Sequence, residues 1–275
     1  MIFLYLTLGL LGALLLIFLI FLFLIKPRSP KRRPDTAAFV GVQYAHRGLH
    51  NKNIPENSLR AFEGAVEKGL GIELDIQLSK DGKVMVFHDF TLNRVAGIDG
   101  KVIDYTAEEL GKMPLNGQPD GIPTLEQVLQ AVDGKVPLII EIKIPGFDCS
   151  VCPKAFELLD GYAGPYCVES FHPFALKWMK ENRPEILRGQ LSSNFFGHKE
   201  SGNNLEFFAV KNLLLNVIAK PDFIAYDIRY PNTWAFRLCR DFWKALPIGW
   251  TVRTEEELTE AKKHFDAWIC ENIYD

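Results

Sequence analysis

Residues 42–89 read VQYAHRGLHNKNIPENSLRAFEGAVEKGLGIELDIQLSKDGKVMVFHD. In this stretch a short apolar run, 42–45, precedes an amphipathic stretch, 58–68, and a second apolar run, 71–77. Ser58 is of a residue type that caps the start of helices. The stretch therefore predicts a strand, a helix and a strand in succession, which is the unit from which parallel sheets are built.

The same alternation continues to the end of the chain, and it predicts an α/β fold. About 235 residues follow position 41, which is the usual size of a TIM (β/α)8 barrel, and the number of units favours this closed barrel over an open, doubly wound sheet. The other predicted strands are 84–87, 137–143, 166–170, 187–191, 222–226, 248–252 and 268–270, and the other predicted helices are 124–132, 152–159, 173–182, 205–216, 232–244 and 255–264.

The N-terminus has a different character. Residues 1–25, MIFLYLTLGLLGALLLIFLIFLFLI, contain no charged side chain. As a helix they would span about 37 Å, enough to cross a bilayer. A cleaved signal peptide is the alternative, but the apolar run is longer than a signal core, no Lys or Arg precedes it, and no Ala-x-Ala follows it. We therefore expect one transmembrane anchor helix before the barrel.

Basic residues follow the apolar run directly. Residues 26–41 are expected to form a basic, Pro-containing linker that is semi-rigid and could reach about 50 Å. The positive-inside rule places the part of the chain after the anchor in the cytoplasm, and basic side chains at the membrane edge attract anionic headgroups. The odd number of cysteines, five, agrees with that location. The basic residues are Lys26, Arg28, Lys31, Arg32 and Arg33.

The charge balance argues against nucleic acid as a partner. The net charge of the whole chain is −3, although five basic residues stand beside the apolar run. No basic stripe with interleaved aromatic residues is present in the sequence after the linker.

Charged residues interrupt two of the predicted buried strands. Because strand side chains alternate between faces, Glu73 and Asp75 point the same way, as do Glu141 and Lys143. Unpaired buried charge is costly, so we expect a metal held by Glu73, Asp75 and Glu141, with Lys143 facing a bound anion. Internal salt bridges are the alternative. Three carboxylates favour Mg²⁺ or Ca²⁺; Zn²⁺ is the competitor, with both histidines turned inward as ligands.

Two histidines stand at the ends of predicted strands. His46 is followed by Arg47, and His88 is followed by Asp89. The carboxyl ends of barrel strands converge on the face where active sites lie. A single histidine there would most often be structural, but two that bracket a pair of acids indicate an acid/base pair. With a cation and metal ligands, this set suits the chemistry of phosphate esters.

These residues lie in motifs through which the chain resembles the glycerophosphodiester phosphodiesterase family. The motifs are A-H-R-G (45–48), P-E-N-S (55–58), F-x-x-A-x-x-x-G (62–69), E-L-D-I-Q-L-S-K-D-G (73–82), V-F-H-D-x-T-L-x-R (86–94), I-P-T-L-E-Q-V-L (122–129), E-I-K (141–143), E-S-F (169–171) and W-T-V (250–252). The resemblance covers most of residues 42–272. It implies a TIM barrel of the phosphatidylinositol phosphodiesterase-like type, dependence on a divalent metal, and hydrolysis of glycerophosphodiesters to an alcohol and glycerol 3-phosphate.

The resemblance also implies roles for individual residues. His46 and His88 match the acid/base pair, Glu73, Asp75 and Glu141 the metal ligands, and Arg47 and Lys143 the phosphate contacts. Phe171 and Trp250, which lie in the last two motifs, are expected in the substrate pocket. The segment 90–123 matches a short insertion that covers the site, within a catalytic domain at 42–275.

The chain departs from the family pattern in its last strands. Residues 266–271 stand where the family usually shows a motif like G-I-I-T-D, and Arg253 follows Trp-Thr-Val where Asn is common. We expect these changes to affect substrate details more than the metal or the histidines.

Two further features leave alternatives open. Phe195 and Phe196, in the loop 192–206, would form either a lid or a lipid contact. Cys149 and Cys152 form a C-x-x-C without a second pair, which favours two unlinked thiols.

Taken together, the sequence predicts a single-pass membrane enzyme that hydrolyses a glycerophosphodiester, or a lysophospholipid to lysophosphatidate. A phospholipase C-type cleavage of a membrane lipid is the alternative reaction. A non-catalytic membrane-tethered scaffold is the alternative of another class. The sequence leaves open whether water or a neighbouring hydroxyl attacks, which alcohol is released, and the oligomeric state.

Overall fold

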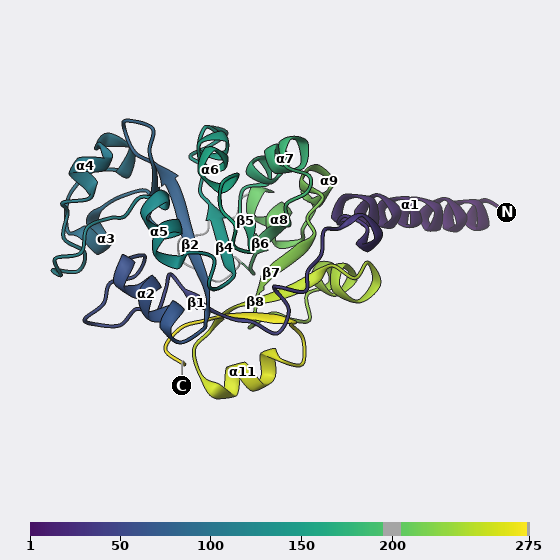
Figure 1. Ribbon diagram of the computed structural model, residues 1–275. Helices are drawn as coiled ribbons and strands as arrows, with labels where there is room; N and C mark the ends of the chain where they lie inside the picture. Colours follow the sequence, from purple (N-terminus) through teal and green to yellow (C-terminus); the bar gives the residue numbers. More distant parts are fainter. Residues whose placement is uncertain (195–204, 274–275) are drawn as a thin grey trace.

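Eight parallel strands close into a barrel in the computed structural model, which describes residues 1–194 and 205–273 (Figure 1). The strand order is β1-β9-β8-β7-β6-β5-β4-β2, and pairing of β1 with β2 closes the ring. The short β3, Val84–Val86, pairs antiparallel with the outer end of β2. The expected closed barrel is confirmed. Its strands are β1 Gln43–His46, β2 Gly71–Leu78, β4 Leu138–Ile142, β5 Tyr166–Ser170, β6 Arg188–Ser192, β7 Phe223–Asp227, β8 Leu246–Val252 and β9 Ala267–Cys270.

Helices lie outside the barrel, close to where the sequence predicts them. The predicted helix 205–216 is divided in two, because Leu213 has a positive φ of 56° that interrupts the helical path. The stretch 232–244 continues from a short α-helix into a π-helical turn. The helices are α1 Ile2–Ile25, η1 Pro30–Arg32, α2 Leu59–Glu67, α3 Asn93–Ala96, η2 Val102–Asp104, α4 Ala107–Leu110, α5 Leu125–Val132, α6 Val151–Leu159, α7 Pro173–Asn182, α8 Leu205–Lys211, α9 Asn216–Ala219, α10 Trp234–Arg237, η3 Leu238–Phe242 and α11 Glu255–Ala261.

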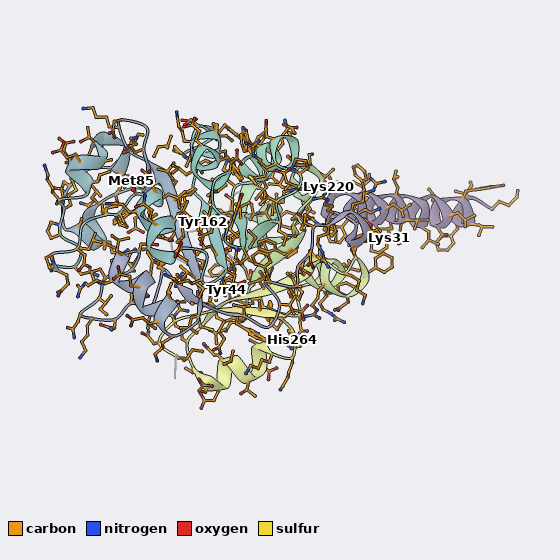
Figure 2. The ribbon with its side chains drawn as sticks, in the orientation of Figure 1. Lys31, Tyr44, Met85, Tyr162, Lys220 and His264 are labelled. Atoms are coloured by element: carbon orange, nitrogen blue, oxygen red, sulfur yellow. The ribbon has the colours of Figure 1, made fainter. Side chains whose placement is uncertain are left out.

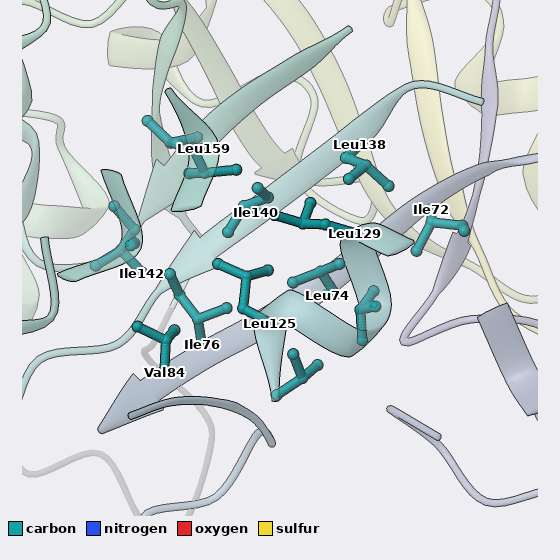
Figure 3. Close-up of a cluster of buried hydrophobic side chains, with 14 of the residues drawn as sticks. Ile72, Leu74, Ile76, Val84, Leu125, Leu129, Leu138, Ile140, Ile142 and Leu159 are labelled. Carbon is teal, nitrogen blue, oxygen red and sulfur yellow. The ribbon is translucent and has the colours of Figure 1, made fainter. Parts of the chain in front are cut away.

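The side chains of strand β2 alternate between the apolar layer outside the barrel and the interior of the barrel. Ile72, Leu74 and Ile76 belong to the apolar layer that packs under α5, where Leu125 and Leu129 also lie (Figure 3). The intervening acidic residues alternate with them and so point into the barrel. The eight residues of β2 thus contribute both to the hydrophobic core and to the candidate site.

The amino-terminal end of the barrel is filled with apolar side chains. Phe39, Tyr44 and Phe223 are buried together in the cluster inside the barrel. Gly189 on β6 makes room for this packing, because a Cβ there would lie 1.9 Å from the Phe223 ring. The interior is therefore closed below the carboxyl ends of the strands.

The insertion 90–123 contains α3, η2 and α4. Its apolar side chains form a cluster of their own that also includes Met85 and Phe87, at and after β3. In Figure 1 the insertion lies at the end of the molecule away from α1.

The linker lies against the barrel rather than extending from it. Arg28 pairs with Asp222, and its backbone N–H donates to the Pro221 carbonyl over 2.9 Å. Farther along, the Gly41 N–H donates to the Asp266 carbonyl. These contacts precede β7 and β9, so the linker crosses the amino-terminal end of the barrel. The reach of about 50 Å that an extended chain would have is not used.

Candidate active site

The chain turns sharply directly after β1. Arg47 and Gly48 both have positive φ, 56° and 81°. A Cβ at Gly48 would lie 2.8 Å from the backbone of Ala61, so the glycine allows the turn to approach α2. The turn directs the Arg47 N–H to Glu73, whose Oε2 accepts this hydrogen bond over 3.0 Å.

Strand register gathers the acidic residues at one level of the barrel. His46 stands opposite Glu73, Asp75 opposite Glu141, and Glu141 opposite Glu169. All four carboxylates are buried. Ligand atoms of Glu73, Asp75 and Glu141 all lie within 4.8 Å of one another. The three residues expected as metal ligands are thus brought together, with Glu169 beside them.

Positive charges contact this acidic cluster. Lys143 Nζ lies 2.7 Å from Glu141 and 3.1 Å from Asp75, and Arg47 Nε lies 3.6 Å from Asp75. The Asn57 amide donates over 2.9 Å to Asp75 Oδ2, the oxygen that Arg47 also contacts, whereas Lys143 contacts Oδ1. Internal salt bridges, the alternative expected from the sequence, are therefore present. They supply two cations for four buried carboxylates, so they do not balance the charge.

The electrostatics reflect this excess of carboxylates. Burial, together with the charges of Asp75 and Glu141, raises the pKa of Glu73 well above its ordinary value. Burial raises the pKa of Glu141 to about 7, although Lys143 opposes the rise. Burial alone would also raise the pKa of Asp75, but Lys143, His88 and Arg47 lower it. Asp75 is thus the carboxylate most strongly held in its charged form.

The donor set fits a divalent cation. Three clustered carboxylates supply hard oxygen ligands, and repulsion among them would be relieved by a cation. Two neighbouring oxygens, Glu169 Oε2 and Asn57 Oδ1, are buried with no hydrogen-bond partner within the described chain. The acidic cluster could therefore bind a metal ion, as the sequence predicts.

His46 is held by Glu271, which lies outside the predicted set of site residues. Glu271 Oε2 lies 3.5 Å from His46 Nδ1, and Arg253 contacts the same oxygen over 3.1 Å. The other ring nitrogen, Nε2, lies 4.0 Å from Glu73. Burial lowers the pKa of His46, whereas Glu271 acts to raise it. Two of the positions at which the chain departs from the family pattern, Arg253 and Glu271, thus lie next to a histidine of the site.

His88 is positioned through a chain of ion pairs. Its Nδ1 lies 2.5 Å from Asp89, and Asp89 accepts from Arg94 over 2.6 Å. Arg94 also pairs with Glu56, which in turn contacts Arg47 over 2.7 Å. Burial lowers the pKa of His88. Each histidine therefore has its Nδ1 beside a carboxylate.

Both histidines open into one small cavity of about 50 Å³. Phe171 and Trp250 also line this cavity, and their rings meet edge to face with centroids 5.5 Å apart. The two aromatic residues thus line the same cavity as the two histidines.

A larger and mostly apolar pocket of about 500 Å³ adjoins the cluster. The pocket shares two lining residues, Glu141 and Phe171, with the small cavity. It is also lined by Lys143, which contacts the acidic cluster. Its apolar wall includes Phe90, Ile144, Phe147, Phe174 and Phe207. The sequence contains no hydrophobic pattern that would predict this pocket, because its wall comes from separate loops.

Some site residues were missed although their motifs were visible. Glu169 belongs to the E-S-F motif, and Glu56 and Asn57 belong to P-E-N-S. Phe195 and Phe196 lie outside the described residues, so the lid and lipid-contact alternatives stay open. Cys149 and Cys152 are free thiols, as expected.

Comparison with known proteins agrees with this geometry. Residues 46–217 match the glycerophosphoryl diester phosphodiesterase family. The chain is similar to a glycerophosphodiester phosphodiesterase of Caldanaerobacter subterraneus subsp. tengcongensis, with 36% identity over 54% of this chain and 65% of the relative. A relative of the same name from Bacillus altitudinis is 44% identical over 52% of this chain and 63% of its own length. The matches thus span somewhat less than two thirds of these relatives.

A solved structure shares the fold. A phosphodiesterase from Oleispira antarctica, in complex with the product sn-glycerol-3-phosphate, matches with a TM-score of 0.69. The match covers 84% of this chain and 93% of that chain, at 23% sequence identity.

Proposed function

The chain belongs to the glycerophosphoryl diester phosphodiesterase family, and from this premise we propose that it hydrolyses glycerophosphodiesters to an alcohol and glycerol 3-phosphate. The observation that carries the proposal is that His46 and His88 line one cavity with Glu73 and Glu141. The two relatives from Caldanaerobacter and Bacillus carry the name of this activity, and the Oleispira enzyme is described with its product. All residues assigned to the reaction are present, which disfavours a non-catalytic scaffold.

The histidines supply the proton transfers. With Nδ1 beside Glu271 or Asp89, the Nε2 atom of each ring would exchange a proton with substrate. One ring removes the proton of the attacking hydroxyl or water, and the other protonates the leaving oxygen. Arg47 and Lys143 bind the phosphate oxygens; Lys143 then exchanges part of its contact with Asp75 and Glu141 for the substrate.

Glu73, Asp75 and Glu141 would hold Mg²⁺ or Ca²⁺, because all three offer hard oxygen ligands. When bound, the ion supplies positive charge for the phosphate oxygens. The preference is tested by restoring chelated protein with Mg²⁺, Ca²⁺ or Zn²⁺. Recovery with Zn²⁺ alone would overturn it.

The apolar pocket beside Lys143 indicates which class of substrate the site accepts. The pocket of about 500 Å³ is lined mostly by apolar side chains, which suits a single hydrocarbon chain. We infer that lysophospholipids are substrates besides soluble glycerophosphodiesters. Exchange of Phe147 for Ser should raise KM for a lysophospholipid and leave KM for glycerophosphocholine unchanged. Equal effects on both would contradict the pocket's role.

Helix α1 supports membrane anchoring. It is 24 residues long, and it is the helix among the described residues that is apolar enough to cross a bilayer. We propose that it spans the membrane once and that the barrel is cytoplasmic, as the basic residues after it indicate. Of these, Arg28 and Arg33 donate to barrel groups, so Lys26, Lys31 and Arg32 are left to face lipid headgroups.

The test of the activity is a product assay with single variants. His46→Ala and His88→Ala should each lower turnover of glycerophosphocholine by at least about 100-fold. His264→Ala is the matched control, since His264 contacts Glu260 outside the site. Near-native turnover in both site variants would exclude the assignment. Release of a phosphorylated headgroup instead of glycerol 3-phosphate would favour phospholipase C-type cleavage.

A further inference from the structure

The barrel covers only the last turn of α1. Residues 2–20 are exposed, whereas Phe21 packs against the cluster that contains Ile25, and Ile25 itself is fully buried. The exposed part, residues 2–20, would be about 28 Å long at 1.5 Å per residue. This matches the hydrocarbon core of a bilayer, about 30 Å thick. The boundary between hydrocarbon and headgroups therefore falls near Phe21.

Whatever packs around the last turn must then lie at headgroup level. The Ile25 carbonyl accepts from Asn216 Nδ2 over 2.8 Å and from Cys239 Sγ over 3.3 Å. Asn216 begins α9 and Cys239 lies on η3. Lys220, after α9, lies 5.7 Å from the ring of Phe23 on α1. Helix α1 is thus held at its base by two elements of the barrel.

The end of η3 carries side chains suited to a membrane interface. Phe242 is 70% exposed, and its ring meets Trp243 edge to face at 5.4 Å. The Lys244 carbonyl, which follows, accepts from Arg33 of the linker over 3.1 Å. In Figure 1 the unlabelled yellow-green helix formed by α10 and η3 lies on the α1 side of the barrel. Figure 2 places Lys31 and Lys220 beside the base of α1.

We propose that this anchor-side surface, made of Lys31, Arg32, Lys220, Phe242 and Trp243, lies in the headgroup layer of the bilayer that α1 spans. Aromatic rings and basic side chains are the groups that membrane interfaces favour, and the cations match anionic lipids. The inference rests on the proposed membrane anchoring.

A consequence for the active site follows from strand direction. The linker contacts residues that precede β7 and β9, whereas His46 and the acidic cluster lie toward the carboxyl ends of the strands. The catalytic mouth therefore opens away from the bilayer, where Phe90 of the insertion lines the apolar pocket with Glu141 and Lys143. Substrate reaches the site through water, as a soluble diester or as a dissolved single-chain lipid.

A rival orientation is available, which makes the proposal testable. Other exposed apolar side chains follow the carboxyl ends of strands: Phe90, Phe147, Leu205 and Phe208. If these entered the membrane, the mouth would face lipid. Phe147 is 75% exposed and Phe242 is 70% exposed, so the two form a matched pair at opposite ends of the barrel.

The experiment uses the full chain in nanodiscs of phosphatidylcholine and phosphatidylserine, with and without lipids that carry a quencher near the headgroup. Phe242→Trp should add fluorescence that these lipids quench at least about twofold more than the fluorescence added by Phe147→Trp. As a second measurement, Trp243→Phe should remove more of the quenchable native fluorescence than Trp178→Phe does.

Stronger quenching at position 147, or equal quenching at both positions, overturns the orientation. Loss of the chain from vesicles on an alkaline wash overturns the anchoring and the orientation together. Turnover of soluble glycerophosphocholine by the same samples reports the activity separately, so failure of the catalytic assignment is distinguishable from failure of this inference.

Discussion

At the level of single residues, two carboxylates, Glu271 and Asp89, position the proposed acid/base pair of His46 and His88. Glu271 lies 3.5 Å from Nδ1 of His46, and Asp89 lies 2.5 Å from Nδ1 of His88. A carboxylate in this place fixes the ring and favours its charged form. Asp89 follows His88 directly in the sequence, whereas Glu271 is brought to His46 by the closure of the barrel.

The first residue-scale prediction concerns Glu271. Glu271→Gln removes a contact that raises the pKa of His46, so that pKa should fall further below its ordinary value. We expect kcat to drop about tenfold or more, and the limb of the pH–rate profile due to His46 to move to lower pH. Glu260→Gln, beside His264, is the control. An unmoved limb would argue that Glu271 has only a structural role.

A second prediction concerns Glu56, which contacts both Arg47 and Arg94. Burial alone would raise the pKa of Glu56, but hydrogen bonds from Arg94 and the charge of Arg47 lower it to about 2 from an ordinary 4.5. Because the pKa is lower in the folded protein, the stabilisation is complete above pH 4.5 and is lost as the pH falls toward 2.

We therefore expect Glu56→Gln to lower the free energy of unfolding at neutral pH by roughly 2–3 kcal/mol. The difference from the unsubstituted protein should shrink in denaturant titrations taken at successively lower pH. A difference that stays constant with pH would show that charge pairing is not the cause.

At the scale of elements, register and turns assemble the site. The pairing of β2 with β4 sets Asp75 opposite Glu141, and the pairing of β1 with β2 sets His46 opposite Glu73. A shift by one residue would send these side chains into the apolar layer under the helices. The turn at Gly48 then fixes the distance between β1 and α2.

The prediction at this scale compares two glycines that both have positive φ. Gly48→Ala adds a Cβ within 2.8 Å of Ala61, whereas Gly82→Ala meets nothing within 4 Å. Gly82→Ala should lower the free energy of unfolding by about 1 kcal/mol, from the backbone conformation alone. Gly48→Ala should cost about 2 kcal/mol or more and reduce turnover, because the clash moves Arg47. Equal losses in denaturant unfolding would refute the steric explanation.

At the scale of the whole molecule, the proposed anchor and the catalytic mouth lie at opposite ends of the barrel. The linker between them is held by Arg28, whose side chain contacts Asp222 over 3.5 Å and the Pro184 carbonyl over 2.8 Å. With the contacts of Asn216 and Cys239 to Ile25, this contact holds the barrel against the base of α1.

The corresponding prediction is that Arg28→Gln loosens the linker. Amide hydrogen exchange in residues 26–33 should become roughly tenfold faster, since a hydrogen bond to a charged group is lost. Arg32→Gln, at an exposed position, should leave the exchange unchanged. Turnover of soluble glycerophosphocholine should be the same in all three proteins. Unchanged exchange in Arg28→Gln would mean that other contacts hold the linker.

Most of the fold could be predicted from the sequence, because buried strands and amphipathic helices leave local patterns. The predicted strand 166–170 and helix 173–182 have the observed bounds, and most other elements agree within two residues. The break at Leu213 was not predictable, because a positive φ in a leucine has no local signal. The path of the linker along the barrel was also not predictable, because its partners, such as Asp222 and Asp266, lie far away in the sequence.

The local motifs contain the groups that the chemistry needs, namely His46, His88, Glu73, Asp75 and Glu141, and strand alternation puts Glu73 and Asp75 on one face. The neighbours of these groups depend on contacts between parts of the chain that are distant in sequence. Pairing of β9 with β1 brings Glu271 to His46, pairing of β5 with β4 brings Glu169 to Glu141, and separate loops form the apolar pocket. The reason is physical. A side-chain pattern records which way a residue points, whereas the groups it meets depend on how distant strands pair.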